Sequence, residues 1–184
     1  GDIMHFLEEL SHIFDIVAGE REIDFIVNLE DTEEEVWFSP SKLERILYNL
    51  LSNAFKYTQP GGYVKLSAKL IKEEKGTFVQ ISVKDNGRGI PKEAQEQIFE
   101  SYYQVEKRDH REGFGLGLSL TRSLIHMHKG EIRVESEINK GSDFIVTLNV
   151  SEDAYNPDER SSENITTEEI QKYNQRIKET IELI

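Results

Sequence analysis

A carboxylate and two closely spaced glycines stand together in Asp85-Asn86-Gly87-Arg88-Gly89. The alternating run before them, residues 78–84, predicts a strand, so the carboxylate should lie at a strand end. Glycine lets a ligand approach the backbone closely. A buried carboxylate beside bare backbone therefore suits the amino group of a flat ring such as adenine. Asn-Gly is also common in hairpin turns, but the Ile90-Pro91 that follows is typical of a helix start and weakens that interpretation.

Two amides and an ammonium group form a second candidate set. The apolar stripe of residues 40–57 predicts a helix, and at about 100° per residue Asn49 and Asn53 fall together beside that stripe, with Lys56 close by. Polar residues at the solvated border of a helix are common and need no function. As a functional set, these side chains would be metal and phosphate ligands. The residue pattern leaves both interpretations open.

Glycines at 113, 115 and 117 open a helix predicted for residues 115–128. Free backbone N–H groups and the helix dipole favour an anion at such an end. A Rossmann loop would follow a strand directly, whereas here the polar segment 100–112 intervenes, which excludes that fold. A loop of this length is often functional, and we expect residues 101–114 to form a mobile lid.

The elements that position these groups are three helices and a sheet of about five strands. Each helix carries a single apolar stripe, which suits packing on one face of a sheet. In the first helix the stripe includes Ile13, and Gly19 is expected to end the helix. The predicted helices cover residues 2–18, 40–57 and 115–128, with a short one after Pro91; the predicted strands cover 23–29, 36–38, 63–71, 77–85, 131–137 and 143–150.

Composition restricts the function classes. The chain has 184 residues and a net charge of −13, so a nucleic-acid backbone would be repelled unless basic residues clustered, and no such cluster is present. There is no cysteine, which excludes disulfides and thiolate chemistry. No apolar run approaches the length of a membrane span. We expect one domain over residues 1–150, followed at 151–184 by an acidic linker and an amphipathic helix that leads to a further domain or partner.

Four segments in order resemble the signature boxes of histidine kinases. Residues 50–57 resemble the asparagine box, 85–90 and 113–118 the two glycine boxes, and 98–100 the phenylalanine box. The match extends over about residues 2–150. It resembles the catalytic ATP-binding domain of a sensor histidine kinase, in the superfamily shared with gyrase and the heat-shock chaperone ATPase. The resemblance implies an α/β two-layer sandwich: a mixed sheet with three helices on one face.

The same resemblance implies roles for individual residues. Asp85 would accept a hydrogen bond from the adenine amino group of ATP. Asn53 would coordinate a Mg²⁺ that bridges the phosphates, Asn49 would support it, and Lys56 would reach a phosphate. The other residues implied for the adenine pocket are Tyr57, Gly87, Gly89 and Ile90. Those implied for the lid and the phosphate-binding helix start are Phe99, Gly113, Gly115, Leu116, Gly117 and Leu118.

The implied function is donation of the γ-phosphoryl group to a histidine on a separate dimerisation and phosphoacceptor domain, with a response-regulator receiver domain downstream. The parent protein would be anchored in a membrane, with this domain in the cytoplasm. Hydrolase relatives carry a glutamate where this chain has Asn49, which favours a kinase. The histidine acceptor box is absent, so we expect no self-phosphorylation. Two alternatives stay open: an ATPase or serine kinase of the same superfamily, and a non-catalytic nucleotide-binding scaffold.

Overall fold

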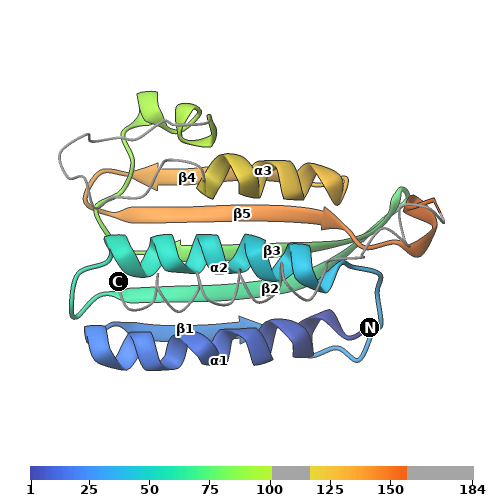
Figure 1. Ribbon diagram of the computed structural model, residues 1–184, viewed down its shortest axis with the longest axis horizontal. Helices are drawn as coiled ribbons and strands as arrows, with labels where there is room; N and C mark the ends of the chain where they lie inside the picture. The colour runs from blue at the N-terminus through green and yellow to red at the C-terminus, as the bar shows by residue number, and fades with distance from the viewer. Residues whose placement is uncertain (101–116, 157–184) are drawn as a thin grey trace, which may run out of the picture.

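The protein folds as a mixed five-stranded sheet with three α-helices on one face, in a computed structural model that describes residues 1–100 and 117–156. The strand order is β1-β2-β3-β5-β4; β1 and β2 run parallel, and the other neighbours are antiparallel (Figure 1). This is the predicted α/β sandwich. Its elements are α1 (Ile3–Arg21), β1 (Asp24–Leu29), α2 (Pro40–Tyr57), β2 (Tyr63–Glu73), β3 (Gly76–Asp85), α3 (Gly117–Met127), β4 (Glu131–Glu137) and β5 (Gly141–Asn149).

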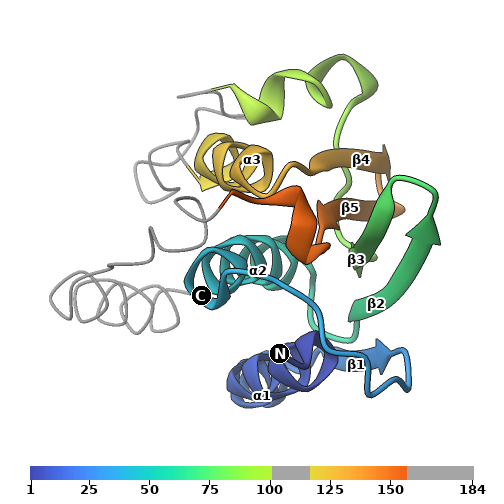
Figure 2. The same ribbon diagram turned by 90° about the vertical axis from the view of Figure 1, so that its right-hand side faces the viewer.

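The core lies between the sheet and the helices, with α2 between α1 and α3 (Figure 2). Leu47 and Leu51 of α2 are fully buried, as are Val64 and Val83 of the two strands below them. Burying each such side chain stabilises the fold by about 1.5–3 kcal/mol. Because β3 runs antiparallel to β2, it ends at the edge where α2 ends and β2 begins. This arrangement brings Asp85 to the C-terminal end of α2.

The first helix is longer than predicted, and Gly19 does not end it. The left-handed residue that closes α1 is Glu22, at φ 55°. Its backbone N–H bonds to the Gly19 carbonyl, and the N–H of Ile23 bonds to the Ala18 carbonyl at 3.0 Å. These two bonds form a Schellman motif, which the buried side chain of Ile23 secures. The apolar stripe predicted for this helix was also too wide, because it included Ile13, which is 43% exposed.

The strand predicted for residues 36–38 is wrong. The N–H of Val36 bonds to the Gly1 carbonyl, whereas the N–H of Trp37 bonds to the Val150 carbonyl, both at 3.0 Å. With partners on two different segments, these residues form no ladder. The described pairing here is one isolated bridge between Asp2 and Glu35.

Further boundaries also differ from the predictions. The single helix expected after Pro91 is two short 3₁₀ turns, Lys92–Ala94 and Gln97–Phe99. The last strand begins at Gly141, two residues earlier than predicted.

The predicted polar lid, residues 101–114, and most of the predicted linker and amphipathic helix lie outside the described residues. In the described part of the chain, no helix is both long and apolar enough to cross a membrane.

Candidate functional site

Two helices and a strand have ends that meet at one edge of the sandwich, at the left of Figure 1. These are the end of α2, the end of β3 and the start of α3. A Cβ added to Gly117 at the start of α3 would lie within 3.0 Å of the Asn49 Oδ1 atom. A Cβ added to Gly87 after β3 would lie equally close to the Tyr57 carbonyl. Most of the residues predicted for ATP binding are therefore brought together here.

Asp85 is a buried carboxylate at the end of β3, with 4% of its surface exposed. Its Oδ1 atom accepts a hydrogen bond from the Gly87 N–H at 2.8 Å. Burial raises the pKa of Asp85 above its ordinary value, while backbone N–H groups of Gly87 and Ser142 act in the opposite direction, and the nearby charge of Asp143 adds to the rise. A buried carboxylate in this setting can accept a hydrogen bond from an amino group of a ligand.

The loop after Asp85 accommodates only glycine at two positions. A Cβ on Gly87 would lie within 3.0 Å of the Tyr57 carbonyl carbon and oxygen. Gly89 has φ +70°, and a Cβ there would meet the backbone of Glu137. The loop is thus held between the end of α2 and the β4–β5 turn by backbone contacts, which no side-chain rearrangement could relieve.

Tyr57, the last residue of α2, lies beside this loop. The Arg88 N–H donates to the Tyr57 carbonyl at 3.4 Å, and the Arg88 guanidinium carbon lies 4.2 Å from the centroid of the Tyr57 ring. The Lys56 ammonium is also near the ring, at 5.3 Å. Two cations therefore flank the aromatic side chain predicted for the adenine pocket.

Asn49 joins α2 to the start of α3. Its Nδ2 atom donates to the Thr121 Oγ1 atom at 2.7 Å, and that hydroxyl donates to the Gly117 carbonyl at 2.9 Å. Thr121 is almost completely buried. The chain of two hydrogen bonds fixes the first turn of α3, where the second glycine box ends, against the middle of α2.

Asn53 is one turn further along α2 and is half-buried. Among the residues that the structure describes, none bonds to its amide, so the amide oxygen is available to a ligand. Nor do the described residues include three histidine, cysteine or carboxylate side chains grouped to hold a metal ion. Mg²⁺ commonly takes one or two protein oxygens and completes its shell with phosphates and water. A single amide oxygen at Asn53 fits that mode of binding.

The other predicted residues lie around this edge. Phe99 is buried and packs edge-on against Phe144 of β5, with ring centroids 6.3 Å apart. The Ile90 N–H donates to the Ser136 hydroxyl at 2.8 Å. Leu118 is half-buried and packs against the core. Gly113, Gly115 and Leu116 lie outside the described residues.

Sequence reasoning missed three contributors to this edge. Thr121 lies four residues after Gly117, and a hydroxyl at that spacing on the glycine-box helix could have signalled it. Gly141 has φ +100°, and a Cβ there would meet the Asp85 carbonyl. Arg88 lies within the glycine box, but nothing in the sequence places it on Tyr57.

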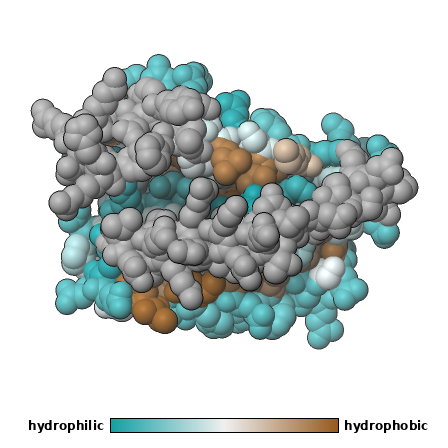
Figure 3. Space-filling model, in the orientation of Figure 1, coloured by the Kyte–Doolittle hydropathy of each residue, from teal (hydrophilic) through white to brown (hydrophobic). Residues whose placement is uncertain are grey.

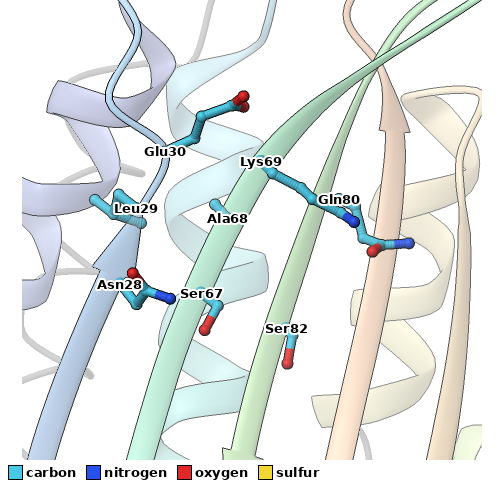
Figure 4. A pocket seen from close by; sticks show the side chains of 8 residues that line it. All are labelled: Asn28, Leu29, Glu30, Ser67, Ala68, Lys69, Gln80 and Ser82. Carbon is cyan, nitrogen blue, oxygen red and sulfur yellow. The ribbon is translucent and has the colours of Figure 1, made fainter.

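Other surface features are separate from this edge. A shallow hollow of about 250 Å³ lies on the sheet face that no described helix covers (Figure 4). Polar side chains line it, among them Ser67, Ser82 and Gln80. On the helical side, Figure 3 shows apolar surface over α3, where Leu120 and Met127 are exposed. None of the residues that line the hollow is predicted for ATP binding, and neither are Leu120 and Met127.

Comparison with known proteins identifies the family. Residues 38–152 match the family described as histidine kinase-, DNA gyrase B-, and HSP90-like ATPase. The chain is 39% identical over 134 residues to the adaptive-response sensory kinase SasA of Synechococcus sp. (strain JA-2-3B'a(2-13)), covering 73% of this chain and 34% of SasA. It is 35% identical over 153 residues to the sensor histidine kinase WalK of Bacillus subtilis (strain 168), covering 82% of this chain and 24% of WalK. The chain thus spans about a third of SasA and about a quarter of WalK.

Solved structures agree with these matches. The catalytic domain of the histidine kinase ThkA superposes with a TM-score of 0.70 at 26% identity, covering 82% of this chain and 94% of that one. Full-length ShkA in complex with AMPPNP superposes with a TM-score of 0.71 at 27% identity, covering 82% of this chain and 30% of ShkA. The chain therefore belongs to the family of histidine kinase-, DNA gyrase B- and HSP90-like ATPases, and its matched part is a histidine kinase catalytic domain.

Proposed function

We propose that this domain binds Mg-ATP and donates the γ-phosphoryl group to a histidine on a separate dimerisation and phosphoacceptor domain. The observation that carries the proposal is the meeting of the buried Asp85 carboxylate, the Asn53 amide and the start of α3 at one edge of the fold. A response-regulator receiver domain would accept the phosphoryl group next. We further propose that the domain acts in the cytoplasm as part of a membrane-anchored parent protein.

In this proposal each end of the nucleotide has its own set of residues. Asp85 accepts a hydrogen bond from the adenine amino group, and Tyr57, Gly87, Gly89 and Ile90 surround the base. Asn53 would hold the Mg²⁺, which when bound neutralises charge on the phosphates. Phosphoryl transfer asks a protein mainly for such positioning and charge neutralisation.

The phosphate end would be completed by further groups of this chain. Lys56 reaches a phosphate, and the backbone N–H groups of Gly117 and Leu118 lie in the first turn of α3, where the helix dipole favours an anion. Phe99, Gly113, Gly115 and Leu116 are proposed for the lid and its hinge. In this arrangement Asn49 supports the site by holding α3 in place.

The environment of Asn49 favours a kinase over a hydrolase. Hydrolysis needs a general base near the γ-phosphate, and an amide cannot serve as one. The Asn49 amide is also already engaged with Thr121. ATP bound here would stay intact until an acceptor histidine approached.

Three of the four described histidines, namely His5, His12 and His128, are poorly placed as acceptors. His5 and His12 are exposed on α1, where each faces a neighbouring carboxylate of the same helix. His128 is buried, accepts the Ser39 N–H at Nε2, and faces the Leu124 carbonyl through Nδ1. Burial lowers the pKa of His128, so it is neutral at pH 7.

The test combines this chain with γ-labelled Mg-ATP, alone and with the phosphoacceptor domain of its parent kinase. We expect acid-labile, alkali-stable label on the acceptor domain and none on this chain. Release of inorganic phosphate by this chain alone would instead identify an ATPase. A nucleotide-dependent rise in the melting temperature is expected for either enzyme and not for a scaffold without a nucleotide site.

A further inference from the structure

Arg88 makes the closest cation–ring contact between described residues. Its guanidinium carbon lies 4.2 Å from the Tyr57 ring centroid. The Arg122 guanidinium lies 5.9 Å from the Phe99 ring, and the two lysine contacts of this kind are 4.9 and 5.3 Å. A guanidinium at 4.2 Å is at the distance of direct stacking on the ring.

The backbone fixes both partners of this contact. The Arg88 N–H donates to the Tyr57 carbonyl at 3.4 Å, and the Arg88 carbonyl accepts from the Asn139 N–H at 2.8 Å. Gly87 and Gly89, on either side of Arg88, are packed too tightly to carry a Cβ. The backbone position of Arg88 is therefore fixed, and stacking on the ring has to order only its side chain.

The stacked pair lies beside the carboxylate assigned to the adenine amino group. Gly87 donates its N–H to Asp85 Oδ1, and a Cβ at Gly87 would lie 3.0 Å from that oxygen and closer still to the Tyr57 carbonyl. These contacts join three parts of the site: Asp85, the backbone of Gly87 and the end of α2. We call this set the adenine corner. The Tyr57 ring thus belongs to a residue whose carbonyl borders the adenine corner.

We propose that Arg88 is a positioning residue for the adenine base: its guanidinium stacks on the Tyr57 ring and holds the ring as a wall of the base pocket. The inference rests on the proposed function and adds a determinant of base affinity to it. Arg88 acts through the ring and not on the phosphates. The flat guanidinium is required, because a lysine ammonium carries the same charge without a plane to stack.

The experiment measures dissociation constants of adenosine and ADP by calorimetry for the wild type, Arg88→Met and Arg88→Lys. Both substitutions should weaken both ligands by the same factor, about three- to tenfold. Arg133→Met is the matched control, since the Arg133 guanidinium pairs with Glu135 on β4 and not with the Tyr57 ring; this variant should bind like the wild type. Thermal unfolding of each variant verifies that it is folded.

A double-mutant cycle isolates the contact. If Arg88 acts through the ring, Arg88→Met should weaken binding little further once Tyr57→Leu has removed the ring. Additive losses, wild-type binding by Arg88→Lys, or a loss seen with ADP but not adenosine would each overturn the inference. Tighter binding by Arg88→Met would also overturn it, since the guanidinium would then occupy space needed by the base. A wild type that binds neither ligand would overturn the proposed function itself.

Discussion

The two ends of the candidate site are built in different ways. At the adenine end, Asp85, Gly87 and Gly89 are held by backbone contacts that leave no room for a Cβ. At the phosphate end, Asn49 and Asn53 project from one helix, and only Asn49 is bonded to a described residue. Under the proposed function, the adenine pocket would be formed before the ligand arrives, whereas the phosphate end would need a metal and phosphates to complete it.

The largest expected effect tests the rigidity of the adenine end. Gly89→Ala should lower the free energy of unfolding by about 2–4 kcal/mol, because an alanine there is strained and also meets the backbone of Glu137. Gly61 is a matched control: it too has a positive φ, +79°, but nothing lies within 4 Å of an added Cβ. Gly61→Ala should therefore cost only the strain, about 1–2 kcal/mol. Equal losses in urea denaturation would show that the loop after Asp85 is not tightly packed.

The next effect is on nucleotide affinity. Asp85→Ala should remove a charge-assisted hydrogen bond worth about 1.5–3 kcal/mol, which weakens ADP binding roughly ten- to a hundredfold. Calorimetric titration of the folded variant measures this loss. An unchanged affinity would remove Asp85 from the adenine pocket.

The same carboxylate should give binding a dependence on pH. Burial raises the pKa of Asp85 above its ordinary value of 3.8, so the carboxylate becomes protonated at a higher pH than an exposed one. ADP affinity should therefore fall as the pH drops toward that raised pKa, and Asp85→Asn should remove this part of the pH dependence. The free energy of unfolding should depend on pH in the opposite direction. Because the pKa of Asp85 is raised in the folded protein, the ionised carboxylate disfavours the fold, and stability should rise as the pH falls. Asp85→Asn should therefore not destabilise the protein near pH 7.

A smaller effect separates the two asparagines of the phosphate end. Asn49→Ala removes the bond to Thr121 and should cost about 1 kcal/mol of stability. Asn53→Ala removes no side-chain hydrogen bond to a described residue, and its stability should stay within about 0.5 kcal/mol of the wild type. Denaturation curves of the two variants test this. A larger loss for Asn53→Ala would mean that its role is structural.

The sequence predicted most of this architecture because its patterns are local. Alternation gave the long strands, and helical stripes gave α2 and α3. The errors arose where distant parts of the chain decide. Residues 36–38 bond to Gly1 and Val150, which no local pattern reveals. Gly19 stays helical because Glu22 and Ile23 supply the cap.

In the candidate site, too, the sequence predicted what local patterns specify and missed what contacts between distant segments decide. Its motifs could be recognised because Asp85, Asn53 and the glycines occupy fixed spacings. The contacts of Arg88 with Tyr57 and of Asn49 with Thr121 join segments 31 and 72 residues apart, and only the fold brings these together. Positioning residues of this kind are therefore hidden from sequence reasoning even where the ligand-binding residues are not.

The most direct test of a preformed adenine end and a metal-completed phosphate end is a titration with ADP, with and without Mg²⁺, on the wild type and Asn53→Ala. We predict that both proteins bind metal-free ADP alike, and that Mg²⁺ tightens binding on the order of tenfold in the wild type but hardly in the variant. The same gain from Mg²⁺ in both proteins, or an equal loss of metal-free binding in the variant, would contradict this account.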